Sequence, residues 1–551
     1  MIFYETKPQR HGEHGGTQRT PCISVFSVPP WLKKTGSFFF FSLLTFSRVY
    51  SQNPGDQLFA APIVHDINII LPQNNYWDSL LYYKSWNDTA AQYIYMQGDV
   101  FIDGTPVNSS GVRLKGNASY NHPGKKKSIV LSFNEFIGGQ DYDGLRSFHL
   151  DNSAYDPTML REKIYLDILN RNGLPAPRCA FARVSYNGGY VGLYKIIESV
   201  NKQFLQARFG NDERNLFKGD PHAPLIWEGS AQQAYYDNFE LKTNESVNDW
   251  SDLVQLINVI NNSGTNFSPQ IEQAFNVRDY LRAWAANNLF GNYDSYMYLP
   301  HNYYLYNDSL AGKFQWITWD VGIVFGVLPV GFQNNEDFPL LYLPDPPQNL
   351  PLNNNLLSVE AYKQEYLDDV CTFFNNDLVP SRLFAVIDSL AAVIRPHVYA
   401  EPDGNQMYTE QQFENNIGYG GVSSWLVFQI PGLKDFISQR RGKVSAQLCD
   451  MGWSCMLGQS FAGLSDDQVI SIYPNPASEK VTISYVAPQY EVQTLYELSD
   501  MRGRILLREN VALQPGETSR TIDISRLRAG VYYLRVIAGC RNTERKIVVV
   551  R

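Results

Sequence analysis

The chain has 551 residues, of which 44% are apolar and 14% aromatic. This composition excludes wholesale disorder and provides for a large packed core, and the length suits about two to four domains. The formal net charge is −9 at pH 7, so the chain lacks the basic face that general nucleic-acid binding requires.

The N-terminal segment has the pattern of an export signal. Lys33 and Lys34 precede SFFFFSLLTF, an apolar run of about ten residues that is too short to span a bilayer. A small residue, Ser51, stands before Gln52 and favours cleavage there. We therefore predict a signal peptide with an N-terminal extension at residues 1–51, with a buried strand as the alternative. No later run approaches ~20 apolar residues, so we expect no transmembrane segment.

Residues from about 60 to 225 predict a strand-rich region with one clear helix. The runs VRLKGNASY, KKKSIVLSF and CAFARVSYNGGYVGLYKIIESV are rich in β-branched and aromatic residues. Asn187-Gly188 indicates a tight hairpin turn. Between these runs, PTMLREKIYLDILNRNG predicts a helix that starts near Pro157 and stops at Gly173.

Residues from about 245 to 450 carry mostly helical apolar spacing. The exception is the pair HNYYLYND and GKFQWITWD, which predicts a hairpin with its turn at residues 309–312. A loop rich in Pro and Asn is expected to follow, GFQNNEDFPLLYLPDPPQNLPLNNN. Cys449 and Cys455 are close enough in sequence to form a disulfide in an exported protein. From about residue 465 the pattern changes to short alternating strands, which predicts a small antiparallel β-sandwich.

Polar residues gather at the open end of the predicted hairpin. Asn302 and Asp320 are expected at neighbouring strand ends, with Asp294 on the preceding loop and His301 beside it. Two carboxylates and an amide oxygen suit Mg²⁺ or Mn²⁺, and phosphoryl transfer uses such a set. The alternative is that Asp294 and Asp320 only cap turns.

Lys125, Lys126 and Lys127 precede the apolar strand SIVLSF. A strand lysine that reaches toward phosphates is a feature of kinases, whereas a lysine run is more often a solvated surface. The run alone leaves both interpretations open.

Taken in order, RLKGNAS, KKS, MLREKIYLDIL, GLPAPR, YNGGYVGLYKIIESV, FGNDERNLFKG, AWAANNLFGNYDSY, HNYYLY and WITWDVGIVFG resemble the CotH kinase-like family of spore coat protein H relatives. The resemblance spans about residues 65 to 450. It implies an α+β fold with an atypical protein-kinase-like core at 60–455, made of the strand-rich lobe (60–225) and a helical second lobe (245–450). It also implies transfer of phosphate from ATP to Ser or Thr of a protein substrate.

The resemblance further implies individual roles. Asp294 corresponds to the catalytic carboxylate and Asp320 to a metal-binding one. Lys127 would pair with ATP phosphates, and Glu198 would lie near the nucleotide. Asn302 as a second ligand to Mg²⁺ or Mn²⁺ rests on the hairpin geometry instead.

Two departures keep a second hypothesis open. The family usually has WDxD around Asp320, and this chain has Gly322 in place of the second acid; Lys115 stands where arginine is common. A non-catalytic, pseudokinase-like surface protein that binds a partner or glycan is therefore the alternative to a secreted kinase. A glycoside hydrolase would need two carboxylates about 5 to 10 Å apart across a cleft.

The tail has a resemblance of its own. YPNPASEKVTI, LYELSDMRGRIL, IDISRLRAGVYYLRV and KIVVVR resemble the C-terminal sorting domain of type IX secretion cargo, over 468–551. This implies contact with the type IX machinery and a secreted or cell-surface location. An ordinary β-sandwich binding module is the alternative.

Overall fold

The structure is a computed structural model. It describes residues 53–87, 93–116, 118–331, 334–424, 428–453, 455, 470–485, 492–513, 519–538 and 541–551. The signal peptide predicted at residues 1–51 lies outside these residues. Within them, no helix is both long and apolar enough to cross a membrane.

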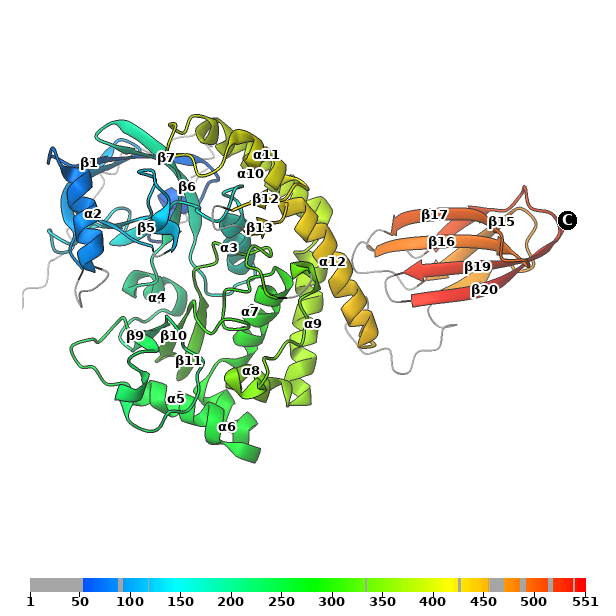
Figure 1. The fold of residues 1–551 in the computed structure, drawn as a ribbon. Coiled ribbons are helices and arrows are strands. Elements are labelled where there is room, and N and C mark those ends of the chain that lie inside the picture. Colours follow the sequence, from blue (N-terminus) through cyan, green and yellow to red (C-terminus); the bar gives the residue numbers. More distant parts are fainter. Residues whose placement is uncertain are drawn as a thin grey trace, which may run out of the picture. The chain divides into compact units, whose positions relative to one another are not determined.

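The first large element is a closed barrel of strands in the order β1-β2-β3-β4-β5-β7-β6 (Figure 1). The β1–β6 pair is parallel, and it closes the sheet. Inward-facing aliphatic and aromatic side chains fill the interior, which accounts for the β-branched composition of these runs. The strands are β1 (Val64–Ile70), β2 (Met96–Ile102), β3 (Thr105–Leu114), β4 (Ile129–Ser132), β5 (Ser147–Asp151), β6 (Cys179–Tyr186) and β7 (Gly189–Glu198).

The turn predicted between β6 and β7 is confirmed. Tyr186 pairs with Gly189, and the two residues between them, Asn187 and Gly188, both have positive φ. Only such a turn matches the twist of the strands, and Asn-Gly adopts it with little strain. The predicted helix is also confirmed as α3 (Arg161–Arg171), which packs against β6. It starts four residues after Pro157, because Met159 has a positive φ that no helix contains.

A second sheet has the order β11-β10-β8-β9. The predicted hairpin is confirmed, because β10 (Tyr303–Asp308) and β11 (Lys313–Thr318) pair antiparallel in full register. Strand β8 (Leu216–Gly219) adds to β10 from far back in the sequence, and β9 (Phe239–Leu241) follows at the edge.

Helices surround this sheet and supply most of the remaining core. Their apolar stripes explain the burial, and α7 packs along α9. The segment predicted as a continuous loop after Gly326 is partly helical, because Pro351 starts α8; proline is well tolerated in a first helical turn. The helices are α1 (Asp56–Phe59), α2 (Tyr76–Asn87), α4 (Lys202–Phe209), α5 (Ser251–Asn262), α6 (Phe267–Ala274), α7 (Val277–Leu289), α8 (Pro351–Leu357), α9 (Glu360–Asn376), α10 (Pro380–Tyr399), α11 (Glu410–Ile417) and α12 (Leu433–Asp450), with the short pair β12 (Val422–Ser423) and β13 (Gln429–Ile430) before α12.

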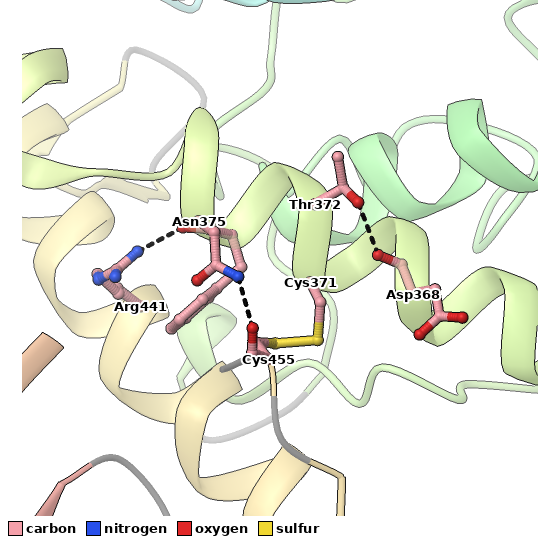
Figure 2. The surroundings of a disulfide bond; sticks show 7 residues. Asp368, Cys371, Thr372, Asn375, Arg441 and Cys455 are labelled. Carbon is pink, nitrogen blue, oxygen red and sulfur yellow. Dashed lines mark hydrogen bonds between the residues drawn. A yellow bond between two sulfur atoms is a disulfide. The ribbon is translucent and has the colours of Figure 1, made fainter. Parts of the chain in front are cut away.

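A disulfide joins Cys371 of α9 to Cys455, which follows α12 (Figure 2). The expected Cys449–Cys455 bridge is wrong, because Cys455 reaches across to a helix 84 residues earlier in the chain. Asn375, one turn along α9, donates to the Cys455 carbonyl at 2.9 Å. The bridge therefore ties the end of the helical region to its middle.

The C-terminal region is strand-rich, as predicted. One sheet has the order β14-β15-β18 and the other β17-β16-β19-β20, and a shared apolar core includes Val481, Tyr496, Ile522 and Leu534. Mixed helix and sheet content is thus confirmed, while the kinase-like character of the core stays a prediction. The strands are β14 (Ile470–Tyr473), β15 (Lys480–Tyr485), β16 (Val492–Asp500), β17 (Ile505–Leu513), β18 (Ser519–Asp523), β19 (Gly530–Ala538) and β20 (Arg541–Val549).

Candidate functional site

Asp320 lies just past the end of β11 and lines a pocket. Its φ of 52° turns the chain sharply away from the strand, a conformation that Asp tolerates better than most residues. The pocket draws its walls from both large sheets and from α3. It is lined by Lys115, Asp151, Glu162, Leu166, Pro177, Ile197, Trp319 and Asp320.

Asp294, His301 and Asn302 form a second group at the same end of the hairpin. His301 Nε2 lies 2.6 Å from Asp294 Oδ1, and Asn302 Nδ2 donates to Asp294 Oδ2 at 3.1 Å. The backbone N–H of Trp319 donates to the Asn302 carbonyl at 3.3 Å, so this group adjoins the Asp320 strand end. Both Asn302 contacts with Asp294 use the amide nitrogen, which leaves the amide oxygen as its potential metal-binding atom.

A buried lysine links the carboxylates on the barrel side. Lys195 Nζ, from the middle of β7, lies 2.6 Å from Glu162 Oε2 and 3.1 Å from Asp151 Oδ1. Lys195 and Glu162 are almost completely buried. Glu162 sits in the first turn of α3, where the helix dipole favours an acidic residue.

The carboxylates of this pocket influence each other's ionisation. Burial, together with the negative charges of Asp151 and Asp320, raises the pKa of Glu162 to about 7 despite the attraction of Lys195. Asp320 is reached by solvent through the pocket but is surrounded by protein. Desolvation first, and then Asp151 and Asp294, raise the pKa of Asp320 against the pull of Lys115. A cation bound in this pocket would favour the ionised forms of both carboxylates.

His301 responds in the opposite way. Burial lowers the pKa of His301, but the hydrogen bond and charge of Asp294 outweigh that effect, so its pKa lies above the ordinary value. A raised pKa means that His301 binds its proton more readily beside Asp294, and their 2.6 Å contact orients that carboxylate.

Gly322 lies close to the Glu162–Lys195 ion pair. A Cβ built at this position would lie 3.8 Å from Glu162 Oε2 and 4.0 Å from Lys195 Nζ. An acid here would meet Glu162 directly. The position at which the resemblance predicts a second acid thus adjoins the Glu162 carboxylate from α3.

Lys125, Lys126 and Lys127 are not among the residues that line the Asp320 pocket. Lys127 Nζ donates to the carbonyls of Tyr120, at 2.7 Å, and His122, so it fixes the turn at residues 118–122. Lys126 is fully buried in an ion pair with Glu401 at 2.6 Å. A solvated surface is therefore the wrong interpretation for these two residues, while the phosphate contact of Lys127 stays a prediction.

Glu198 ends β7 in a network of arginines. Its Oε1 pairs with Arg178 at 2.5 Å, and its Oε2 accepts from Arg178 and Arg208 at 3.1 and 3.0 Å. The neighbouring Ile197 lines the pocket. Glu198 thus anchors the strand end beside the pocket, and its contact with a nucleotide stays a prediction.

Sequence reasoning assigned no role to Asp151, Glu162 or Lys195. A signal was present: Lys195 stands inside the apolar strand GLYKIIE, and a charge in a buried strand usually has a partner. The partners themselves come from β5 and α3 and could not be found by spacing along the chain.

No three His, Cys, Asp or Glu side chains gather closely enough to hold a metal by themselves in the part of the chain that the structure describes. Asp320 and Asn302 would supply two oxygen donors, and phosphate oxygens could complete such a site.

Two protein-family models match this chain. The model of the CotH kinase protein matches residues 112–444, and that of the secretion system C-terminal sorting domain matches residues 471–550. Inner spore coat protein H of Bacillus subtilis is 30% identical over 209 residues, which are 37% of this chain and 55% of that protein. Invasin CotH2 of Rhizopus delemar is 26% identical over 344 residues, 58% of each chain.

The chain therefore spans little more than half the length of these relatives. Among solved structures, dimeric latent PorU from Porphyromonas gingivalis is 22% identical, covering 15% of this chain and 9% of PorU with a TM-score of 0.14. So short an overlap carries no argument about the fold.

Proposed function

Because this chain belongs to the CotH kinase protein family, we propose that it transfers phosphate from ATP to Ser or Thr hydroxyls of a protein, with Mg²⁺ or Mn²⁺. One observation carries the proposal. Asp320, Glu162, Asp151 and Lys115 line one pocket, and the buried Lys195 pairs with Glu162 and Asp151 behind its wall. The Asp294–His301 pair adjoins the same strand end.

The donor set fits a metal-bound triphosphate. Oxygen ligands from Asp320 and Asn302 suit a hard divalent cation. Lys115 and Lys195 supply positive charge for phosphate oxygens. Burial first, and then the charges of Asp151 and Asp294, raise the pKa of Asp320, and a bound cation would favour its ionised form. When bound, ATP would provide the phosphoryl group that is transferred.

Each side chain then has a distinct task. Asp294 accepts the proton of the acceptor hydroxyl, and His301 holds that carboxylate in one orientation through its 2.6 Å contact. Glu162 keeps Lys195 extended toward the pocket, in the manner of an ion pair that positions a phosphate-binding lysine. Catalysis would arise from positioning and electrostatics.

Lys127 and Glu198 support segments that adjoin the Asp320 pocket. Lys127 holds the turn at residues 118–122, and Asn152, next to Asp151, donates to Ser119 and Lys126 of the same loop. A phosphate contact of Lys127 and a nucleotide contact of Glu198 are the finer parts of the same proposal.

Calorimetric titration with ATP in Mg²⁺ and then Mn²⁺ tests it. Asp320→Asn is expected to weaken metal-dependent binding more than tenfold. Asp294→Asn is expected to keep binding but lower phosphate transfer to protein about 10²- to 10⁴-fold. Glu240→Gln, which removes an exposed carboxylate from β9, is the matched control and should change neither.

A non-catalytic binding protein is the second candidate, and Gly322 in place of an acid favours it. Under that function, the folded wild-type protein shows no metal-dependent ATP binding. That single result would overturn the kinase proposal.

The coarse location follows from the tail. The sorting domain marks the chain for secretion or display at the cell surface. Within the proposal, the signal peptide at 1–51 takes it across the inner membrane and the type IX machinery across the outer one.

A further inference from the structure

A second, larger pocket lies between α5 and residues 227–233, and it opens to solvent. Its volume is about 680 Å³, within the range of small-molecule sites. One wall is the face of α5 formed by Ser251, Val254, Gln255 and Asn258, which recur at helical spacing. The opposite wall begins at Trp227 and continues into the short helix η2 (Gln232–Tyr235).

The chemistry of this lining is unusual for an acidic protein. Every lining side chain is uncharged: amides from three glutamines and an asparagine, hydroxyls from two serines, one valine, one alanine and one indole. A charged ligand would lose its hydration without gaining an opposite charge here. Gln232 is already hydrogen-bonded within the protein, but a purely apolar ligand would cover the polar side chains of Gln233 and Gln255 without offering them hydrogen bonds.

A neutral saccharide satisfies both requirements. Its hydroxyl groups both donate and accept, as do side-chain amides and serine hydroxyls. The C–H face of a pyranose ring is apolar and packs against an indole such as that of Trp227, whose bulk supplies apolar contact area. We propose that this cavity binds an uncharged oligosaccharide.

The walls are fixed before any ligand arrives. Tyr235, which is 1% exposed, accepts from the Glu228 N–H at 3.0 Å and donates to the Gly229 carbonyl at 2.9 Å, so it pins the loop after Trp227. Gln232 donates to the Asn248 carbonyl at 3.0 Å and accepts from the backbone N–H of Trp250 at 3.2 Å. A preformed cavity spends little binding free energy on ordering its walls.

Helix α5 is held as firmly. Asp252, in its first turn, accepts hydrogen bonds from Asn215 at 3.1 Å and from Asn307 at 2.9 Å. The opposite face of the helix buries Leu253, Leu256 and Ile257 in the main core. The lining face therefore keeps its orientation, and the saccharide site does not depend on the proposed phosphoryl transfer.

The test uses the full-length chain and four probes: maltotetraose, cellotetraose, the tetramer of N-acetylglucosamine, and tetragalacturonate as a charged comparator. At least one neutral tetrasaccharide is expected to bind with a dissociation constant below about 1 mM, measured by calorimetry. Trp227→Ala should weaken that binding at least tenfold, and Gln255→Ala about fivefold.

Trp86→Ala is the matched control, because it removes a half-exposed indole from α2, outside the cavity. It should leave saccharide binding unchanged, and ATP titration of each variant reports separately on the phosphoryl-transfer site. Absence of binding by every neutral probe would overturn the proposal. So would equal binding by tetragalacturonate, unchanged binding in Trp227→Ala, or Trp227-dependent binding of an uncharged Ser/Asn peptide in place of the sugars.

Discussion

At the scale of single residues, Glu162 and Asp320 make cation binding depend on pH. Both carboxyl groups have raised pKa values, that of Glu162 lying at about 7. A divalent cation favours the ionised forms, so its binding expels protons. We expect the affinity for Mn²⁺ with ATP to increase with pH by up to about tenfold per unit below pH 7 and to level off above it, as Glu162 becomes ionised.

Calorimetry in two buffers of different ionisation enthalpy measures the number of protons released. Proton release should fall in Glu162→Gln if this residue carries the effect. An affinity that is flat across this pH range would contradict the interpretation. In the metal-free protein, stability changes with pH in the opposite direction. Because the pKa of Glu162 is higher in the folded state, this group stabilises the fold below its unfolded-state pKa, and that stability is lost as the pH rises through about 7.

Substitution of Gly322 tests whether the second acid that the resemblance predicts would affect cation binding. Gly322→Asp would place a carboxylate beside Glu162 Oε2, so like-charge repulsion should lower the metal-free free energy of unfolding by about 1 kcal/mol. In Mn²⁺ the same variant should gain stability relative to wild type. Thermal unfolding with and without Mn²⁺ measures both effects.

Gly322→Asn is the isosteric control, because it fills the same space without charge. An identical response of the Asp and Asn variants would show that the charge at this position has no effect on cation binding.

At the scale of elements, the segment after Asp320 docks on the end of α7. Phe325 N–H donates to the Phe290 carbonyl at 2.8 Å, and Gly326 N–H donates to the Gly291 carbonyl at 3.1 Å. Phe436 of α12 packs over both glycines, each of which has positive φ. This contact fixes the spacing between Asp320 and Asp294, because each lies a few residues from it.

Gly326→Ala should disrupt that contact. Its Cβ would overlap the Phe436 ring, lying 2.6 Å from Cδ2, in addition to the strain of positive φ. We expect a loss of about 3 kcal/mol or more in the free energy of unfolding, measured by urea denaturation.

Gly331→Ala is the matched control, since Gly331 also has positive φ but a Cβ there meets nothing within 4 Å. It should cost only about 1 kcal/mol. Equal losses in the two variants would mean that packing against Phe436 contributes nothing.

At the scale of the whole molecule, the C-terminal region is expected to act as an address. Its two sheets enclose a core of their own, which includes Ile483, Leu498 and Ile547, so its removal should leave the rest of the chain folded. Deletion of residues 471–551 should therefore keep the chain in the periplasm, with ATP binding retained. Fractionation of cells with an active type IX system measures this, and secretion of the truncated chain would contradict it.

The sequence by itself predicted the local features of this protein. Asn187-Gly188 predicts its turn because few residue pairs adopt positive φ twice, and the β10–β11 hairpin follows from strand composition on each side of a polar turn. The resemblance to CotH proteins and to sorting domains was likewise readable, since it rests on ordered motifs.

Tertiary structure alone decided which distant residues meet. The ion pair of Lys195 with Glu162, the Cys371–Cys455 bridge and the closure of β1 on β6 each join segments that no local pattern relates. The uncharged cavity between Trp227 and α5 belongs to the same class. Backbone conformation is governed by neighbours along the chain, whereas burial and charge pairing are settled when the elements pack. The chemistry of the Asp320 pocket depends on burial and charge pairing.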